Sequence, residues 1–187
     1  MAQKRKDWNG LISGFKASDL VFLDESGCNT DMTRRYAYSL GGSRAVDSAP
    51  LSKPKNMTIL PSIQLDGTLR YTTFSGGTTV ERFKRYLETD LLSHLNGNSV
   101  LIMDNMKSHH AKAVKNLLDS SGVRYIYLPP YSPDLNPIEK LWSKVKSFLR
   151  KFKARTLDAL PNAIQNAFHA VTVSDCSGWF RFCGYAL

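Results

Sequence analysis

Three acidic residues of this 187-residue chain stand where metal-dependent phosphodiester chemistry needs carboxylates. Asp24 ends the apolar run 20–23, and Asp104 ends a second apolar run, 100–103. Glu139 follows Asp104 after an interval of thirty-four residues, at the start of a predicted helix. Two aspartates at strand ends and one glutamate at a helix start can be brought together into a cluster that holds two divalent metal ions.

Each aspartate also has a simpler interpretation. Aspartate is common in the turn that follows a strand, so Asp24 and Asp104 could serve only there. Asn105 and His109 follow the second aspartate and favour the metal site, because such side chains hold metal ligands in place. Capping of the next helix is a further role for His109. Glu25 is a rival ligand, although the alternation of side chains along an extended chain points it away from the side of Asp24.

Glu139 has a strong alternative role as a helix cap. Asn136 suits the N-cap and Pro137 the first position of a helix, so Glu139 falls at the third position of a capping box. The prolines of the segment 128–139 fix where this helix begins, which a metal ligand on the first helical turn requires. From the helix alone, both roles stay open.

The helix predicted over 137–153 separates an apolar face from a basic one. At about 100° per residue, Lys146, Arg150 and Lys153 continue along the side of Glu139, where they could follow a DNA backbone. A solvated basic face is the simpler alternative. The apolar stripe consists of Ile138, Leu141, Trp142, Val145, Phe148, Leu149 and Phe152.

The composition is that of a globular, basic protein. The chain has 25 Lys+Arg against 16 Asp+Glu, a formal charge of +9, and 42% hydrophobic residues. Such a charge attracts a polyanion, nucleic acid first and a membrane surface second. The three cysteines form no C-x-x-C pair, and no run approaches the ~18 apolar residues of a membrane span. These features predict a cytoplasmic protein that does not cross a membrane.

The pattern of elements predicts an α/β fold with a mixed sheet, a hairpin on one side and βαβ units on the other. An Asp-Gly turn joins the two hairpin strands. Residues 1–18 are interpreted as a linker remnant or a short helix, and 28–55 as loop with one short strand over 35–40. The strands are expected at 20–24, 57–65, 68–74, 99–104 and 123–128, and the helices near 79–94, 108–120, 137–153 and 156–171.

These residues resemble the catalytic domain of DDE transposases of the mariner superfamily, in its bacterial insertion-sequence branch. The proline-rich motif and the thirty-four-residue interval are the most specific features. The C-terminal run 179–185 (WFRFCGY) is also similar to that branch, and the likeness covers about 18–186. The matching motifs are LDES at 23–26, MDN at 103–105 with His109, and LPPYSPDLNPIE at 128–139 with Trp142 and Lys146.

The resemblance implies an RNase H-like fold over 19–187 in which Asp24, Asp104 and Glu139 bind two Mg²⁺ ions, or Mn²⁺ in vitro. It further implies cleavage of double-stranded DNA at element ends, strand transfer into target DNA at TA, and a homodimer in the active complex. The implied location is the bacterial cytoplasm, with the nucleoid.

Members of this family usually carry N-terminal helix-turn-helix modules, and none precedes Asp24. Either a separate polypeptide or reading frame is expected to supply them, or the chain is a truncated product. Two alternatives stay open: a related nuclease without strand transfer, and a basic DNA-binding or dimerisation remnant without catalysis.

Overall fold

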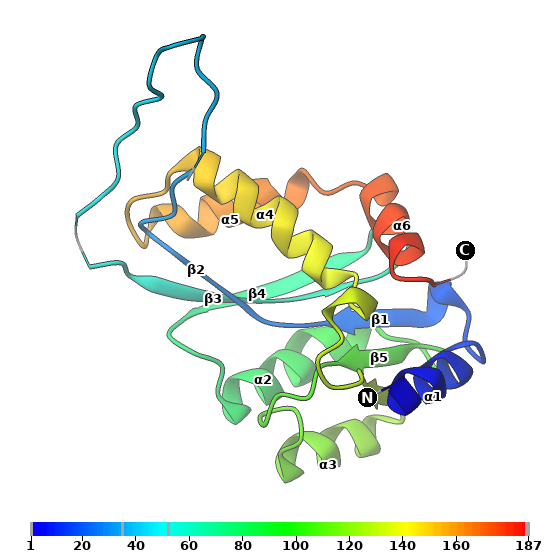
Figure 1. The fold of residues 1–187 in the computed structure, drawn as a ribbon. Coiled ribbons are helices and arrows are strands. Elements are labelled where there is room, and N and C mark those ends of the chain that lie inside the picture. The colour runs from blue at the N-terminus through cyan, green and yellow to red at the C-terminus, as the bar shows by residue number, and fades with distance from the viewer. Residues whose placement is uncertain (1, 35, 52, 186–187) are drawn as a thin grey trace.

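In the computed structural model, which describes residues 2–34, 36–51 and 53–185, a six-stranded mixed β-sheet lies between layers of helices (Figure 1). The predicted mixed α/β architecture is confirmed. The strands are β1 (Leu20–Leu23), β2 (Ser26–Asn29), β3 (Asn56–Ile63), β4 (Leu69–Ser75), β5 (Val100–Met103) and β6 (Arg124–Tyr127). The helices are α1 (Ala2–Ile12), α2 (Val80–Tyr86), α3 (Lys112–Ser121), α4 (Ile138–Phe152), α5 (Ala159–His169) and α6 (Val173–Phe182).

The strand pairing brings two predicted site residues to one edge of the sheet. β1 pairs in parallel with β5, and β5 in parallel with β6. Leu23 lies beside Met103 in this register, so the aspartates that follow them leave the sheet side by side. β3 and β4 form the predicted antiparallel hairpin, which turns at Gly67, where a φ of 87° suits glycine.

A proline explains why the chain breaks between β1 and β2. Both strands pair antiparallel with the same edge of β3 and keep one register, in which Asp24 faces Pro61. The Asp24 N–H donates to the Pro61 carbonyl at 3.4 Å. Proline has no N–H to donate in return, so the ladder is interrupted here. The interruption leaves Asp24 and Glu25 outside regular strand structure, at the edge where β5 also ends.

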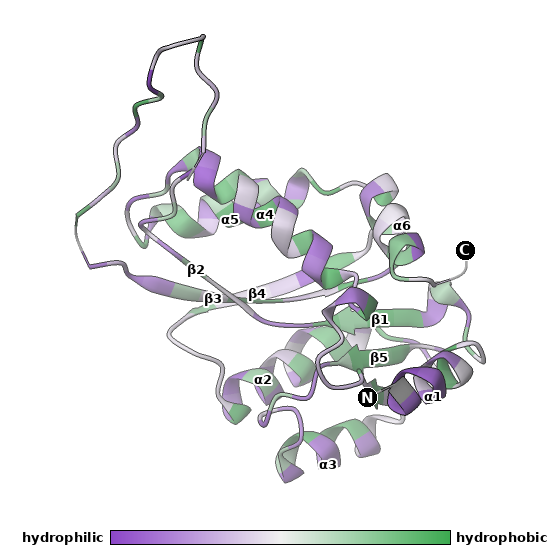
Figure 2. Ribbon diagram, in the orientation of Figure 1, coloured by the Kyte–Doolittle hydropathy of each residue, from purple (hydrophilic) through white to green (hydrophobic). Residues whose placement is uncertain are grey.

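Two apolar clusters, one on each face of the sheet, hold the layers together. Leu20 and Phe22 point to the face covered by α4, α5 and α6, whereas Val21 and Leu23 point to the face covered by α2 and α3. Apolar residues dominate β1 and β5 between these layers (Figure 2). Most of the predicted stripe of α4 is buried, but Phe148 is only half-buried, and Phe152, where the helix ends, is 45% exposed.

Two predictions for the segment after β1 were wrong. The described residues 36–40 form no strand, and most of the segment between β2 and β3 projects from the body as an exposed loop (Figure 1). A strand needs a ladder partner, and no described element lies beside this one; Arg35 itself is outside the described residues. The sequence Ser26–Asn29 was instead expected partly as loop, but pairing with β3 makes it β2. Weak intrinsic strand preference was overridden by the neighbouring strand.

The four helices predicted from the pattern are present with different ends, and the structure adds α1 and α6. The N-terminal segment forms α1, and Trp8 is only 3% exposed within the core. Thr79 caps α2, and the helix continues through π-helical and 3₁₀ turns to His94. α3 begins at Lys112, later than predicted, and ends at Gly122 in the left-handed conformation. No helix within the described residues has both the length and the apolar character that crossing a membrane requires.

Helix α6 was not predicted, and a capping box explains its start. Thr172 accepts a hydrogen bond from the Asp175 N–H, while the Asp175 carboxylate accepts from the Thr172 N–H. The same carboxylate pairs with Lys144 of α4, so one side chain links the two helices. This arrangement positions Phe180, which packs edge-on against Phe22 of β1 at 5.3 Å between ring centroids.

Replacing Asp175 with alanine is expected to lower the free energy of unfolding by about 1 kcal/mol at neutral pH, the usual cost of losing such a cap. Burial raises the pKa of Asp175, but the bonds from Lys144 and Thr172 outweigh it, so the pKa lies below its usual value. The carboxylate therefore stabilises above the unfolded-state pKa and loses this effect as pH falls through the lowered one. Urea unfolding at neutral pH and near pH 3 measures the free energy of unfolding of the unsubstituted chain and of Asp175→Ala. A difference between the two that did not shrink at pH 3 would contradict this role of Asp175.

Candidate active site

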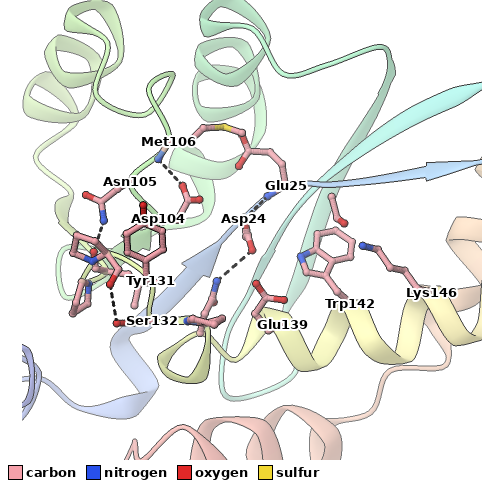
Figure 3. Close-up of a pocket in the computed structure, with 16 residues that line it drawn as sticks. Asp24, Glu25, Asp104, Asn105, Met106, Tyr131, Ser132, Glu139, Trp142 and Lys146 are labelled. Carbon is pink, nitrogen blue, oxygen red and sulfur yellow. Dashed lines mark hydrogen bonds between the residues drawn. The ribbon is translucent and has the colours of Figure 1, made fainter. Parts of the chain in front are cut away.

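The three predicted acids line one pocket at the carboxyl edge of β1 and β5 (Figure 3). The cavity has a volume of about 650 Å³ and lies between the ends of these strands, the proline-rich segment 128–133 and the first turns of α4. Asp24, Asp104 and Glu139 come from three separate elements. The structure thus brings together in one place the side chains that the sequence selected as candidates.

Asp24 is the most buried of the three acids, with 9% of its surface exposed. Its Oδ1 accepts the Glu25 N–H at 2.8 Å, and its Oδ2 accepts from the Asn136 Nδ2 at 3.3 Å. Burial, and then the negative charge of Asp104, raise its pKa to about 7, with Glu139 adding to the effect. These carboxylates therefore repel one another, which a bound cation would relieve.

Asp104 has partners of its own. Its Oδ1 lies 2.9 Å from the His109 Nδ1 and accepts the Met106 N–H at 2.9 Å. Burial acts to raise the pKa of Asp104, but these hydrogen bonds and the positive charge of His109 outweigh it and hold the pKa below its usual value. Asp104 is therefore an ionised carboxylate with a fixed orientation beside the less readily ionised Asp24.

Glu139 does not act as the cap of its helix. The Ile138 N–H donates to the Asn136 Oδ1 at 3.3 Å, so Asn136 supplies a cap-like bond, but the first turn of α4 shows no capping box within the described chain. The Glu139 carboxylate faces the pocket and the side of Asp24 instead (Figure 3). The sequence left open whether Glu139 caps its helix or serves as a metal ligand, and this geometry favours the metal ligand.

The proline-rich segment shapes the wall of the pocket. Asn105, predicted to support the acids, donates from its Nδ2 to the Leu128 carbonyl at 2.5 Å and so ties the end of β5 to this segment. Within this segment, Tyr131 adopts a positive φ of 57°. Further along, the Leu135 carbonyl accepts a hydrogen bond from the hydroxyl of Tyr185 at 2.5 Å. The C-terminal aromatic run therefore anchors the segment that leads into Glu139.

His109, the other predicted supporting residue, is completely buried between two carboxylates. Its Nδ1 faces Asp104, and its Nε2 lies 3.1 Å from the Glu25 Oε1. Burial lowers the pKa of His109, but the bonds to Asp104 and Glu25 outweigh it and raise the pKa to about 10. Glu25 was considered only as a rival ligand, and its bond to a residue 84 positions away has no signal in the sequence.

The three predicted cations lie along α4 but differ in their surroundings. Lys146 lines the acidic pocket and also, with Arg150, a neighbouring polar hollow beside β2. The Lys146 Nζ lies 5.9 Å from the centre of the Trp142 ring, another lining residue that was not predicted as a site residue. Lys153 ends α4 in the left-handed conformation and pairs with Asp47 of the projecting loop. Lys146 and Arg150 are therefore the cations placed next to the pocket.

The donor set of the pocket suits a hard divalent cation. Carboxylate oxygens are the ligands that Mg²⁺ prefers, and it keeps several waters when it binds, for which the cavity has room. The raised pKa of Asp24 marks a concentration of negative charge that the chain itself leaves only partly balanced. Within the described residues, the one group of ligand-type atoms all within 4.8 Å of one another is Glu25, Asp104 and His109, which contains only one of the three acids.

A mixed sheet of this order with acids at the ends of neighbouring parallel strands defines an RNase H-like domain. The comparisons agree with this class. The structure superimposes on the Mos1 transposase of a pre-cleavage transpososome with a TM-score of 0.78 at 17% identity, covering 97% of this chain and 58% of that one. For the catalytic domain of Mos1 mariner transposase the TM-score is 0.69 at 16% identity, covering 96% and 85%.

Residues 19–161 match the family described as DDE superfamily endonuclease, and the chain belongs to that family of enzymes. Among curated proteins it is 32% identical over 83 residues to the Tc1 transposase of Caenorhabditis elegans, which is 44% of this chain and 30% of the relative. It is also 32% identical over 75 residues to the Tcb2 transposase of Caenorhabditis briggsae, covering 40% and 28%. The matches thus span less than a third of the length of these relatives.

Proposed function

We propose that this chain is the catalytic domain of a mariner-type transposase, which cuts DNA strands at element ends and joins them to target DNA. The observation that carries the proposal is the meeting of Asp24, Asp104 and Glu139 in one pocket at the carboxyl edge of the sheet. Family membership supports the class of chemistry, and the likeness to Mos1 catalytic domain supports the fold.

In the proposed mechanism, Asp24, Asp104 and Glu139 hold two divalent ions, Mg²⁺ or Mn²⁺, through their carboxylate oxygens. When bound, these ions supply activation of the attacking oxygen and charge stabilisation of the leaving oxygen. Asn136 fixes the Asp24 carboxylate, and the Met106 N–H fixes that of Asp104. Hydrolysis of a phosphodiester leaves a 3′-hydroxyl, which then attacks a second phosphodiester and displaces its alcohol oxygen.

Lys146 and Arg150 are proposed to receive the backbone of double-stranded DNA as it enters the pocket. They lie one helical turn apart on α4 and line a hollow that shares Lys146 with the acidic pocket. Phosphate contacts of this kind position DNA without reading its sequence. Lys153 belongs to the same row, but its contact with DNA requires release from Asp47.

Replacing Lys146 and Arg150 together with alanine is expected to weaken binding to any DNA duplex and to lower the slope of log affinity against log salt by about 2. Fluorescence anisotropy at several salt concentrations measures both quantities. Lys112→Ala, on α3 at the opposite face of the sheet, is the matched control. An unchanged slope in the double variant, or an equal change in the control, would contradict this DNA path.

Four finer features are part of the proposal. They are insertion at TA, a homodimer in the active complex, helix-turn-helix modules outside residues 19–187, and membership of the bacterial insertion-sequence branch, with a place at the nucleoid. The homodimer draws support from the neighbouring paired-end and strand-transfer complexes of Mos1, whereas insertion at TA rests on the sequence resemblance. The proline-rich motif supports the branch, whereas the curated relatives are from nematodes.

A strand-joining assay tests the proposed function against a related nuclease that only cuts. The chain is incubated with Mn²⁺, a labelled duplex that ends in a free 3′-hydroxyl, and supercoiled plasmid. The proposal predicts label covalently joined to plasmid DNA. Nicked plasmid without joined label would favour the nuclease, and DNA binding without any metal-dependent product would favour a basic remnant.

A further inference from the structure

Glu25 is an enclosed carboxylate whose role the metal site does not explain. Only 4% of its side chain is exposed, and its Oε2 is enclosed with no hydrogen-bond partner among the described residues. Its Oε1 lies 3.1 Å from the His109 Nε2. A buried carboxylate normally requires a paired charge, and His109 is the partner at hand.

Three side chains here have the atom types of a metal site, but they are arranged as two ion pairs that share His109. The three are Glu25, His109 and Asp104. A carboxylate oxygen lies within 3.1 Å of each ring nitrogen of His109, Glu25 at Nε2 and Asp104 at Nδ1. Each ring nitrogen is therefore already directed at a carboxylate oxygen, and neither points to an open metal position. His109 therefore links the two acids rather than sharing an ion with them.

The ring of His109 is held in this orientation by the α2–α3 side of the sheet. The Phe83 ring lies against it, with 4.3 Å between the ring centres. The Tyr127 hydroxyl donates to the backbone carbonyl of His109 at 2.9 Å. Glu25 reaches the ring from this same face, because the chain alternates after β1 and turns Glu25 away from the side of Asp24.

We propose that Glu25 is a positioning residue, which acts through His109 to hold the Asp104 carboxylate in the orientation that metal binding needs. Resting on the proposed function, this inference makes Glu25, which also lines the pocket, a support for a metal ligand and not a ligand itself. Two adjacent residues, Asp24 and Glu25, thereby serve one site from opposite faces of the sheet. The arrangement is the hydrogen-bonded support that ligating carboxylates commonly have.

The test compares Glu25→Leu, which removes the acceptor, with Glu25→Gln, which keeps an oxygen that can face His109. Mn²⁺ affinity and stoichiometry are measured by calorimetry on chains whose melting shows that they are folded. The Leu variant is expected to bind Mn²⁺ roughly 10- to 100-fold more weakly at unchanged stoichiometry, and the Gln variant to lose less. Adding Glu25→Leu to His109→Gln is expected to weaken binding little further, because the two residues act as one unit.

Loss of one bound ion in the Glu25 variants would overturn the proposal in favour of a direct ligand. Unchanged affinity in Glu25→Leu, or fully additive effects with His109→Gln, would overturn it as well. If the unsubstituted chain bound no Mn²⁺, the proposed function would fail, and crystal structures of the variants without metal would decide the positioning role alone. There, an Asp104 side chain that leaves its place in Glu25→Leu supports the proposal, and one that stays opposes it.

Discussion

Replacing Asp104 with asparagine is expected to reduce DNA strand cleavage by more than about 100-fold. Loss of a partner that only supports a metal ligand typically costs ~10- to 100-fold in affinity or activity, and loss of the ligand itself should exceed that. Asparagine keeps the size of the side chain and an oxygen that can accept the Met106 N–H, so the fold should survive. Gel-based cleavage of labelled DNA with Mn²⁺ provides the measurement.

Asp24→Asn and Glu139→Gln should lose activity to the same degree, because all three acids share the pocket. Glu88→Gln is the matched control: the Glu88 side chain is 41% exposed and, among the described residues, forms an ion pair with Lys84 alone, on its own helix. Glu139→Gln is the most informative of these variants. Cleavage at the unsubstituted rate in that variant would remove Glu139 from the site and contradict the proposed mechanism.

Divalent metal is expected to stabilise the folded chain by an amount that depends on Asp24. At 100 times the dissociation constant, binding to the native state adds about 2.7 kcal/mol. For a chain of this size, this corresponds to a rise in melting temperature of roughly 5–10 °C. Thermal melts with Mg²⁺, with Mn²⁺ and with a chelator measure the shift. Asp24→Asn should abolish it.

The shift should also depend on pH, with a sign fixed by the raised pKa of Asp24. That pKa lies at about 7 in the folded chain, above its ordinary value. Without metal, the folded state therefore loses stability as pH rises from the ordinary pKa of an aspartate to about 7. Metal must displace the proton of Asp24, so the gain from metal should grow from about pH 5 to about pH 8. A gain that was equal at both pH values, or that survived in Asp24→Asn, would contradict the role of this carboxylate.

The sequence indicated the acids and the sheet that positions them because both signals are local. Asp24 and Asp104 end short apolar runs, and such runs become neighbouring strands in an α/β fold. The prolines before Glu139 marked the start of α4 to within a residue. Periodicity also separated the buried stripe of α4 from the row that contains Lys146 and Arg150.

What the sequence could not indicate depends on contacts between distant residues. β2 exists only because β3 lies beside it, and the strand expected over 35–40 is absent from its described residues because nothing pairs with it. The residues around Glu139 fit a capping box, but that interpretation was wrong, because the Glu139 side chain points into the pocket and makes no cap bond. The link from Glu25 through His109 to Asp104 joins the loop after β1 to the loop after β5, and no pattern in the chain reveals it.

The most direct test of the central claim is a crystal structure of the chain soaked in Mn²⁺, with the metal located by its anomalous scattering. The proposed mechanism predicts manganese held by oxygens of Asp24, Asp104 and Glu139, with His109 still bonded to Glu25. Manganese bound instead by Glu25 and His109, with Glu139 turned away from both aspartates, would contradict it.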